Sequence, residues 1–109
     1  VDALRLRRKL TIGFNRSIKD LDGVIAISSM DAAFAIEDPD ENALKYPRQA
    51  RTPFNLTGNP ALAMPNGFDD DGLPLAMQII GRNFDEATIY RIAAAYEGAT
   101  EWHKRRPPL

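Results

Sequence analysis

The fold of this chain is decided by residues 53–65, Pro-Phe-Asn-Leu-Thr-Gly-Asn-Pro-Ala-Leu-Ala-Met-Pro, and by residues 72–81, Gly-Leu-Pro-Leu-Ala-Met-Gln-Ile-Ile-Gly. Thr57-Gly58-Asn59-Pro60 ends any preceding helix, because glycine and proline interrupt regular structure. Residues 61–64 and 73–80 are apolar runs typical of strands, and turn-forming residues lie between them at 66–72. This arrangement predicts an antiparallel β-hairpin.

Two further elements are predicted upstream of the hairpin. Apolar residues recur at helical spacing through residues 2–20, at Leu6, Leu10, Phe14 and Leu21, which predicts an amphipathic helix that ends before Asp22-Gly23. Residues 24–27, Val-Ile-Ala-Ile, are typical of a buried strand. The basic residues of the helix, which we interpret as a solvated face, are Arg5, Arg7, Arg8, Lys9, Arg16 and Lys19.

The connection between that strand and the hairpin decides the predicted topology. Acidic residues and two prolines predict an irregular surface loop over residues 31–47, and residues 46–56 allow one or two helical turns on either side of Pro53. About 30 residues are enough for a right-handed crossover between parallel strands. We therefore predict a single α/β domain over residues 1–109, with a small mixed sheet, flanking helices and strands missing from its edges.

The C-terminal quarter predicts one helix followed by an extended tail. Asn83 and Glu86 have the spacing of a capping box, and the helix continues to about Gly98 with one apolar face. That face consists of Ile89, Ile92, Ala93 and Tyr96. The prolines after Arg106 predict an extended tail from Trp102 to Leu109, and we expect Met64, Met77 and Phe84 to fill the core.

Composition excludes several classes of function. Fourteen basic residues nearly balance 15 acidic ones, and there is no cysteine, so we expect no nucleic-acid partner, no disulfide and no thiolate metal site. No apolar run is long enough to span a bilayer, and the chain opens with Val1-Asp2 rather than with a start methionine or a signal-like segment. We therefore expect a piece of a longer, cytoplasmic protein with no cofactor, no metal and no membrane partner.

Few residues in this chain could perform nucleophilic chemistry. Ser28-Ser29 follows a predicted strand, but it lacks the glycines that expose a nucleophile on a tight turn, so we interpret the pair as structural or as part of a pocket wall. Residues 69–72, Asp-Asp-Asp-Gly, do not have the ligand spacing of a calcium loop and predict a hairpin turn. His103, in a basic tail, is interpreted as exposed or packed on Trp102.

The order of motifs from about Arg51 to Leu109 resembles the C-terminal end of the amidase signature family. Residues 22–27 also resemble the family's strand near the substrate pocket, although family members commonly follow it with Thr-Pro where this chain has Ser28-Ser29. The motifs that carry the resemblance are Pro-Phe-Asn-Leu-Thr-Gly-Asn-Pro-Ala, Met-Pro-Asn-Gly-Phe, Gly-Leu-Pro-Leu-Ala-Met-Gln-Ile-Ile-Gly-Arg, Phe-Asp-Glu-Ala-Thr and Trp-His-Lys-Arg-Arg-Pro.

The resemblance implies a larger α/β enzyme that breaks carbon–nitrogen amide bonds with a Ser, cis-Ser, Lys triad. Those catalytic residues lie upstream of the matched motifs, so we expect no catalytic residue in this chain and no activity of the chain alone. By position, Arg48, Thr52 and Asn55 are predicted to line the substrate pocket, although a helix-stabilising or turn-capping role is favoured for Asn55.

The resemblance also implies a branch and a set of partners. The branch that amidates misacylated tRNA is expected to carry an acidic residue a few positions before the Pro-Phe-Asn motif, where residues 48–51 are basic, so we favour a general amidase with a small-molecule amide substrate. We expect the chain alone to self-associate. Two alternatives remain: a stand-alone module that binds a peptide or protein at a strand edge, and a nucleic-acid binder that uses the basic helix.

Overall fold

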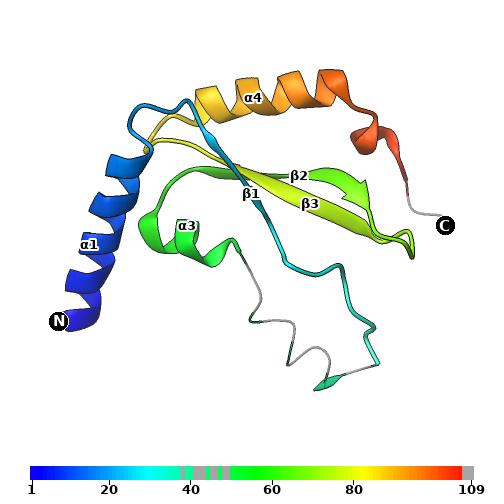
Figure 1. The fold of residues 1–109 in the computed structure, drawn as a ribbon, viewed down its shortest axis with the longest axis horizontal. Helices are drawn as coiled ribbons and strands as arrows, with labels where there is room; N and C mark the ends of the chain where they lie inside the picture. Colours follow the sequence, from blue (N-terminus) through cyan, green and yellow to red (C-terminus); the bar gives the residue numbers. More distant parts are fainter. Residues whose placement is uncertain (38, 41–43, 45–46, 48–49, 107–109) are drawn as a thin grey trace.

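The computed structural model describes residues 1–37, 39–40, 44, 47 and 50–106, which form a sheet with one helix packed on a face and two at its rim (Figure 1). In chain order the elements are α1 (Asp2–Ser17), β1 (Val24–Ile27), α3 (Thr52–Thr57), β2 (Ala61–Phe68), β3 (Pro74–Ile80), α4 (Glu86–Ala99) and the 3₁₀ turn η1 (Trp102–Lys104). The predicted α/β class with flanking helices is confirmed.

The described residues form a three-stranded sheet in the order β1-β3-β2, and both pairings are antiparallel. The sheet is therefore not mixed in its pairing, which corrects the predicted parallel pairing of the first strand. β1 and β2 do run in the same direction, but β3 lies between them because it pairs with β2 on one edge and with β1 on the other. The long connection after β1 thus leads to the far edge of the sheet (Figure 1).

The predicted hairpin is confirmed and is longer than expected. β2 continues to Phe68, and Gly72 closes the turn with φ +80°, in the left-handed region that favours glycine. An Asp69 carboxylate oxygen accepts hydrogen bonds from the backbone N–H groups of Asp71 and Leu73, at 3.0 and 2.7 Å. The acidic cluster is therefore the hairpin turn that its sequence predicted.

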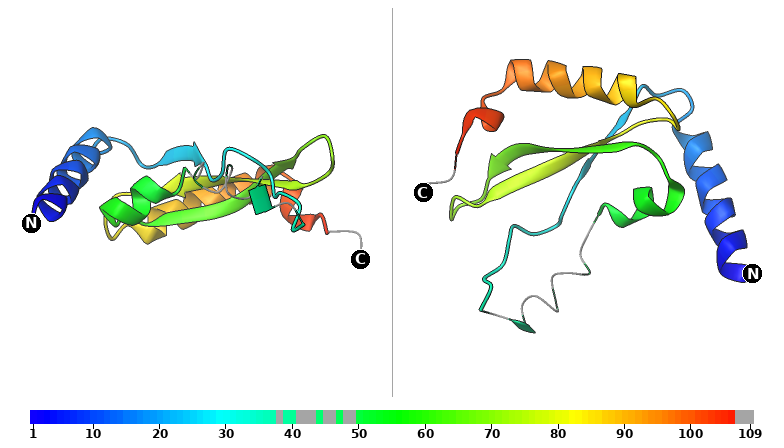
Figure 2. Two further views of the ribbon diagram at one scale, coloured as in Figure 1. Left: turned by 90° about the horizontal axis from the view of Figure 1, so that it is seen from below. Right: turned by 180° about the vertical axis from the view of Figure 1, so that it is seen from behind.

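The core lies between α4 and one face of the sheet (Figure 2). Its buried members are Met64, Met77, Ile79, Ile89 and Ala93, with Leu62, Ile92 and Tyr96 packed around them. The predicted apolar face of the last helix and the core positions of Met64 and Met77 are confirmed. Gly81 allows the close approach of helix to sheet, because a Cβ there would lie 2.6 Å from Ile89 Cγ2.

The start of α4 corrects two predictions. Helix α4 begins at Glu86 with Asp85 at its N-cap, so Asn83 and Glu86 form no capping box. A hydrogen bond from Thr88 and the nearby Arg82 guanidinium hold the pKa of Asp85 below its ordinary value of 3.8. Phe84 is no core residue: its φ is +61° and its side chain is 95% exposed, because the turn into α4 directs it away from the sheet.

Helix α1 packs beside α3 rather than on the sheet (Figures 1 and 2). The Phe14 and Phe54 rings lie 5.5 Å apart, and Arg7 Nε donates a hydrogen bond to the Leu56 carbonyl oxygen at 2.8 Å. Residues Leu6 and Leu10 of the predicted apolar face are exposed. The helix is confirmed, and much of its apolar face remains uncovered by the described residues.

Helix α3 realises one of the helical turns predicted around Pro53. Pro53 lies in its first turn, where a missing N–H costs no hydrogen bond, and Gly58 ends it with φ +75°. The irregular loop predicted before it is observed for residues 31–37, while much of 38–49 lies outside the described residues.

The C-terminal tail departs from the extended form predicted for it. Trp102–Lys104 forms η1, which contacts β2, and the Trp102 ring lies 6.2 Å from the Phe68 ring. The Arg105 guanidinium covers both rings, at 5.0 Å from the Phe68 centroid and 5.8 Å from that of Trp102. The aromatic contact holds the tail against the hairpin, and residues 107–109 lie outside the described part.

Candidate functional site

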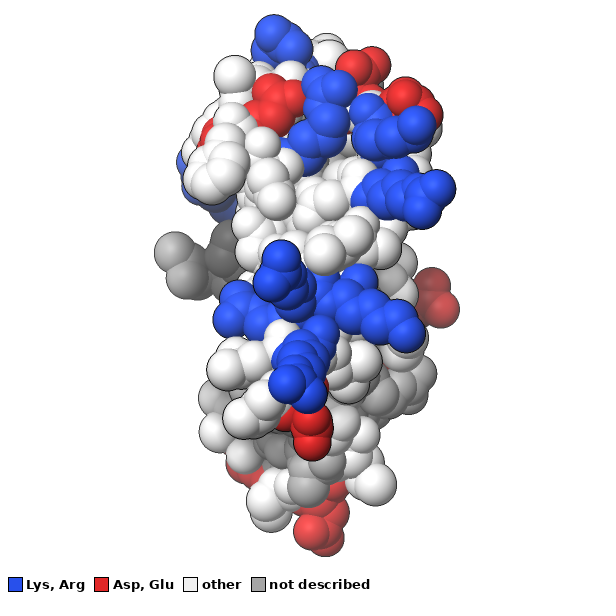
Figure 3. Space-filling model, turned by 90° about the vertical axis from the view of Figure 1, so that its left-hand side faces the viewer, with Lys and Arg blue, Asp and Glu red and all other residues white. Residues whose placement is uncertain are grey.

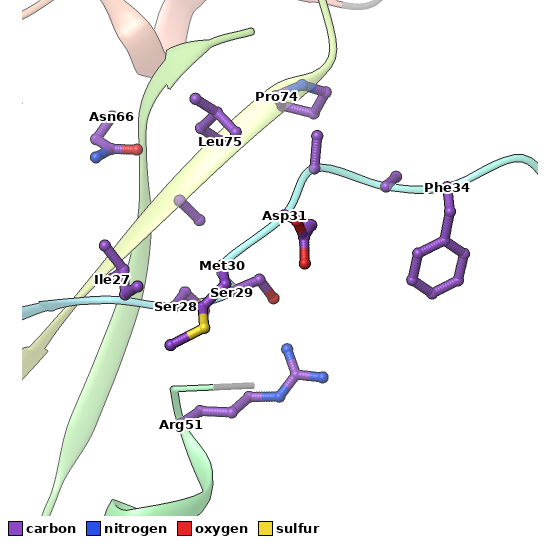
Figure 4. Close-up of a pocket in the computed structure, with 13 residues that line it drawn as sticks. Ile27, Ser28, Ser29, Met30, Asp31, Phe34, Arg51, Asn66, Pro74 and Leu75 are labelled. Atoms are coloured by element: carbon purple, nitrogen blue, oxygen red, sulfur yellow. The ribbon is translucent and has the colours of Figure 1, made fainter. Parts of the chain in front are cut away.

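A cavity of about 530 Å³ lies where β1 ends (Figure 4). Its wall consists of Ile27 and the residues after it up to Phe34, Arg51 just before α3, Asn66 of β2, and residues 74–76 of β3. Cavities between roughly 300 and 1,000 Å³ hold small organic ligands. The strands and the loops around them therefore bring segments that are far apart in the sequence to one site of suitable size.

Antiparallel pairing fixes the end of β1 at this cavity. The Ser28 N–H donates to the Ala76 carbonyl oxygen at 3.1 Å, and Gln78 Nε2 donates to the Ile27 carbonyl oxygen at 2.8 Å. Ser28 is 7% exposed and Gln78 is 3% exposed. Ser28 and Ser29 line the cavity, which agrees with their interpretation as part of a pocket wall.

A β-bulge brings a polar side chain to the same cavity. Pro65 pairs with Ala76 and Gly67 with Leu75, so Asn66 is an extra residue in β2. Such bulges bend a strand and redirect a side chain. Asn66 accordingly lines the cavity and supplies an amide that can donate and accept hydrogen bonds.

The charged side chains that line the cavity among the described residues are Arg51 and Asp31 (Figure 4). Asp31 has an interaction of its own within the chain. No carboxylate in the described part of the chain forms an ion pair with Arg51. The cavity wall thus combines apolar groups, an amide, serine hydroxyls and a guanidinium that can meet a ligand.

The three residues predicted for the pocket remain predictions. Arg48 lies outside the described residues. Thr52 and Asn55 lie on α3 with exposed side chains, and neither belongs to the described wall of this cavity. Sequence reasoning missed Arg51 and Asn66 as wall residues. The Asn66-Gly67 pair inside a strand was the one available signal, because it is typical of a bulge.

The described residues give less support to a metal site, to a site at His103 or to a membrane-spanning helix. No group of three or more His, Cys, Asp or Glu side chains among the described residues could hold a metal ion. His103 is half-buried, with its Nδ1 buried and without a hydrogen-bond partner in the described part of the chain. None of the helices in residues 1–37 or 50–106 is both long and apolar enough to cross a bilayer.

Basic side chains gather on the face of the molecule that carries α1 (Figure 3). The basic residues of α1, all exposed, are Arg5, Arg7, Arg8, Lys9 and Arg16. Acidic side chains lie above and below them on that face. The structure therefore agrees with the interpretation of this helix as a solvated, charged surface.

These features together define a small α/β domain with an open sheet, one covered face and a ligand-sized cavity at a strand end. A family model described as Amidase matches residues 2–90, which is most of the chain. The chain belongs to the amidase family. The resemblance carried by the motifs of residues 51–109 is thereby confirmed.

The relatives are similar over nearly the whole chain but are much longer. The A subunit of glutamyl-tRNA(Gln) amidotransferase from Lysinibacillus sphaericus is 44% identical over 109 residues, which are 98% of this chain and 22% of the relative. The same subunit of Oceanobacillus iheyensis is 38% identical with the same coverage. The crystal structure of this subunit from Thermotoga maritima superposes with a TM-score of 0.72 at 31% identity, over 80% of this chain and 19% of that one.

Proposed function

We propose that this chain is the C-terminal part of an amidase that breaks a carbon–nitrogen amide bond in a small molecule. The observation that carries the proposal is the match of the family model to residues 2–90, combined with a ligand-sized cavity at the end of β1. In this proposal the chain supplies part of the sheet and one wall of the substrate cavity. A Ser, cis-Ser, Lys triad upstream of this chain supplies the nucleophile and its base.

The proposed mechanism divides the work between the two parts of the protein. The upstream nucleophile attacks the amide carbon, and backbone amides stabilise the oxyanion of the tetrahedral intermediate. The C–N bond then breaks, ammonia leaves with a proton from the upstream acid–base pair, and water releases the carboxylic acid from the acyl-enzyme. The cavity wall described above holds the acyl part of the substrate, with apolar contacts from Ile27, Phe34 and Leu75 and polar contacts from Asn66 and Arg51. Rigid placement of that wall by β1 and β3 orients the amide for attack.

The test compares the isolated chain with the complete protein that contains it. We expect ammonia release from simple aliphatic or aryl amides by the complete protein and none by the chain alone. Hydrolysis by the chain alone that disappears in Ser28→Ala or Ser29→Ala would show that the catalyst lies within these residues and would overturn the proposal. The cytoplasmic location and the absence of nucleic-acid and membrane partners remain predictions.

We also propose that the isolated chain self-associates through its uncovered sheet surface. Ile25 and Ile27 pair with Ile79 and Met77, so they share the face on which α4 packs, yet they are 63% and 50% exposed. β1 is also an edge strand of the described sheet, with its outer backbone groups unpaired by another strand. Light scattering should find dimers or larger species, whereas a stable monomer would favour the alternative of a stand-alone interaction module.

A second candidate is a subunit of an amidotransferase, and the names of the relatives favour it. Arg48 and Arg51 support the general amidase instead, because the tRNA-dependent branch is expected to carry an acidic residue at about this place. The complete protein distinguishes the two when it is assayed with glutamine and with simple amides. Turnover of simple amides without a partner subunit supports the general amidase, and turnover of glutamine that needs a partner subunit supports the second candidate.

A further inference from the structure

The Arg51 side chain forms part of the cavity wall (Figure 4). Its backbone carbonyl oxygen accepts hydrogen bonds from Phe54 and Asn55, at 3.2 and 3.4 Å, which fixes the main chain at the start of α3. The guanidinium extends along the side of the cavity that faces the Asp31 segment. The position is therefore set by the fold, and the charged end of the side chain borders the space that a ligand would fill.

The Arg51 guanidinium forms no ion pair with a carboxylate in the described part of the chain. Asp31 is the one carboxylate among the described lining residues, and it has an interaction of its own and no ion pair with Arg51. Arginine stays protonated at all physiological pH values and presents two parallel N–H groups that match a carboxylate. An anionic group in the cavity would meet this fork beside the apolar wall formed by Ile27 and Leu75.

We propose that Arg51 binds a carboxylate on the acyl part of the amide substrate and so determines the substrate class. This inference rests on the proposed function, because it assigns the cavity to the substrate of an amidase. The carboxylate accepts hydrogen bonds from the guanidinium, while the aliphatic part of the acyl chain contacts the apolar wall. Arg51 acts in binding and takes no part in bond cleavage.

The first test measures substrate preference in the complete protein that contains this chain. Succinamate carries a carboxylate, and butanamide has the same number of carbon atoms without it. We expect wild type to prefer succinamate in kcat/KM, and Arg51→Gln to lower the ratio of the two kcat/KM values by about 10- to 100-fold, the loss of one charge-assisted hydrogen-bonded pair. Arg51→Lys keeps the charge and should recover part of the ratio.

Arg8→Gln is the matched control, because Arg8 is an exposed arginine on α1 away from the cavity and should leave the ratio unchanged. An equal preference in wild type and Arg51→Gln, with both amides hydrolysed, would overturn the inference. So would a wild-type enzyme that does not prefer succinamate.

The second test reads the same contact without turnover. Calorimetry of succinate binding to the complete protein should give a Kd that rises about 10-fold or more in Arg51→Gln. Equal Kd values, or no binding of succinate to wild type, would overturn the inference even if amides are hydrolysed. Arg51-dependent binding of succinate by a protein that hydrolyses no amide would instead overturn the proposed function and support the anion site.

Discussion

Gly81→Ala tests the close contact that joins the sheet to α4. A Cβ at this position would lie 2.6 Å from Ile89 Cγ2, and 3.5 Å from both the Asp85 carbonyl oxygen and Pro60 Cγ. Carbon atoms in favourable contact are about 3.5–4.0 Å apart, so the methyl group overlaps Ile89 by about 1 Å. Neither residue can move easily. Ile89 is β-branched and only 3% exposed, and the N–H and the carbonyl oxygen of Gly81 are both hydrogen-bonded.

The hydrogen bonds around Gly81 set the magnitude of the expected effect. Its N–H donates to the Pro60 carbonyl oxygen at 2.9 Å, and its carbonyl oxygen accepts from Asn59 Nδ2 at 3.0 Å. Overpacking a core costs about 1–3 kcal/mol, and replacing glycine returns about 0.4–1 kcal/mol through the unfolded chain. We therefore expect a net loss of about 1–2 kcal/mol in the free energy of unfolding.

Urea unfolding followed by circular dichroism, at one fixed protein concentration, measures this loss. Gly98→Ala is the matched control, because Gly98 lies in the exposed part of α4 with nothing within 4 Å of the place that the added methyl carbon would take, and it should raise stability by up to about 1 kcal/mol. In an Ile89→Ala background the cost of Gly81→Ala should vanish. An equal cost in both backgrounds, or no cost at all, would refute the reasoning.

Three further predictions concern the helix cap, the tail and a buried amide. Asp85→Asn should lower the free energy of unfolding at pH 7, and the difference from wild type should shrink as the pH falls below 3.8. The reason is that a carboxyl group with a lowered pKa in the folded state stabilises the fold above its ordinary pKa and loses this effect as the pH falls through the folded-state pKa. A pH-independent difference would contradict this. Phe68→Ala should shift the fluorescence of Trp102, the one tryptophan, to longer wavelength, because the ring contact at 6.2 Å is lost; an unchanged spectrum would mean that the tail is held otherwise. Asn59→Ala should cost about 1–3 kcal/mol in the urea assay, because Asn59 is 7% exposed and its amide joins the Gly81 carbonyl to Asn15; a cost near zero would show that water replaces these bonds.

Local signals predicted most of the elements correctly. The periodicity of residues 2–20 predicted α1, the β-branched run predicted β1, and the turn residues around Asp69 predicted the hairpin. Each of these signals lies within one contiguous segment and acts through backbone preference or through one amphipathic face. The same is true of Gly58, which ends α3 in the left-handed conformation.

Some predictions that depended on distant residues were wrong. The position of Phe84 is one case, because its apolar side chain predicted burial and the turn into α4 exposes it instead. The tail is another, because prolines predicted an extended chain while the Trp102 ring found a partner in Phe68 on the hairpin. In both cases the outcome depends on which surfaces the fold brings together.

At the candidate site, too, local motifs were informative and contacts between distant residues were not predicted. The motifs around Pro53 and Gly72 identified the family, whereas the pocket-lining role of Arg48, Thr52 and Asn55 remains a prediction. They did not identify Arg51 and Asn66 as part of the wall. Arg51 lies at the start of a short helix and Asn66 in a bulge. Both line the cavity only because the fold brings them beside the end of β1 and the start of β3.

The sequence by itself determined the family of this protein, its local helices and strands, and the hairpin of residues 61–80, because each is encoded in contiguous residues. The tertiary structure alone decided that β3 lies between β1 and β2. That order brings Ser28, Arg51 and Asn66 to one cavity. The physical reason is that strand pairing and cavity walls depend on contacts between residues tens of positions apart, where loop closure and packing outweigh local preference.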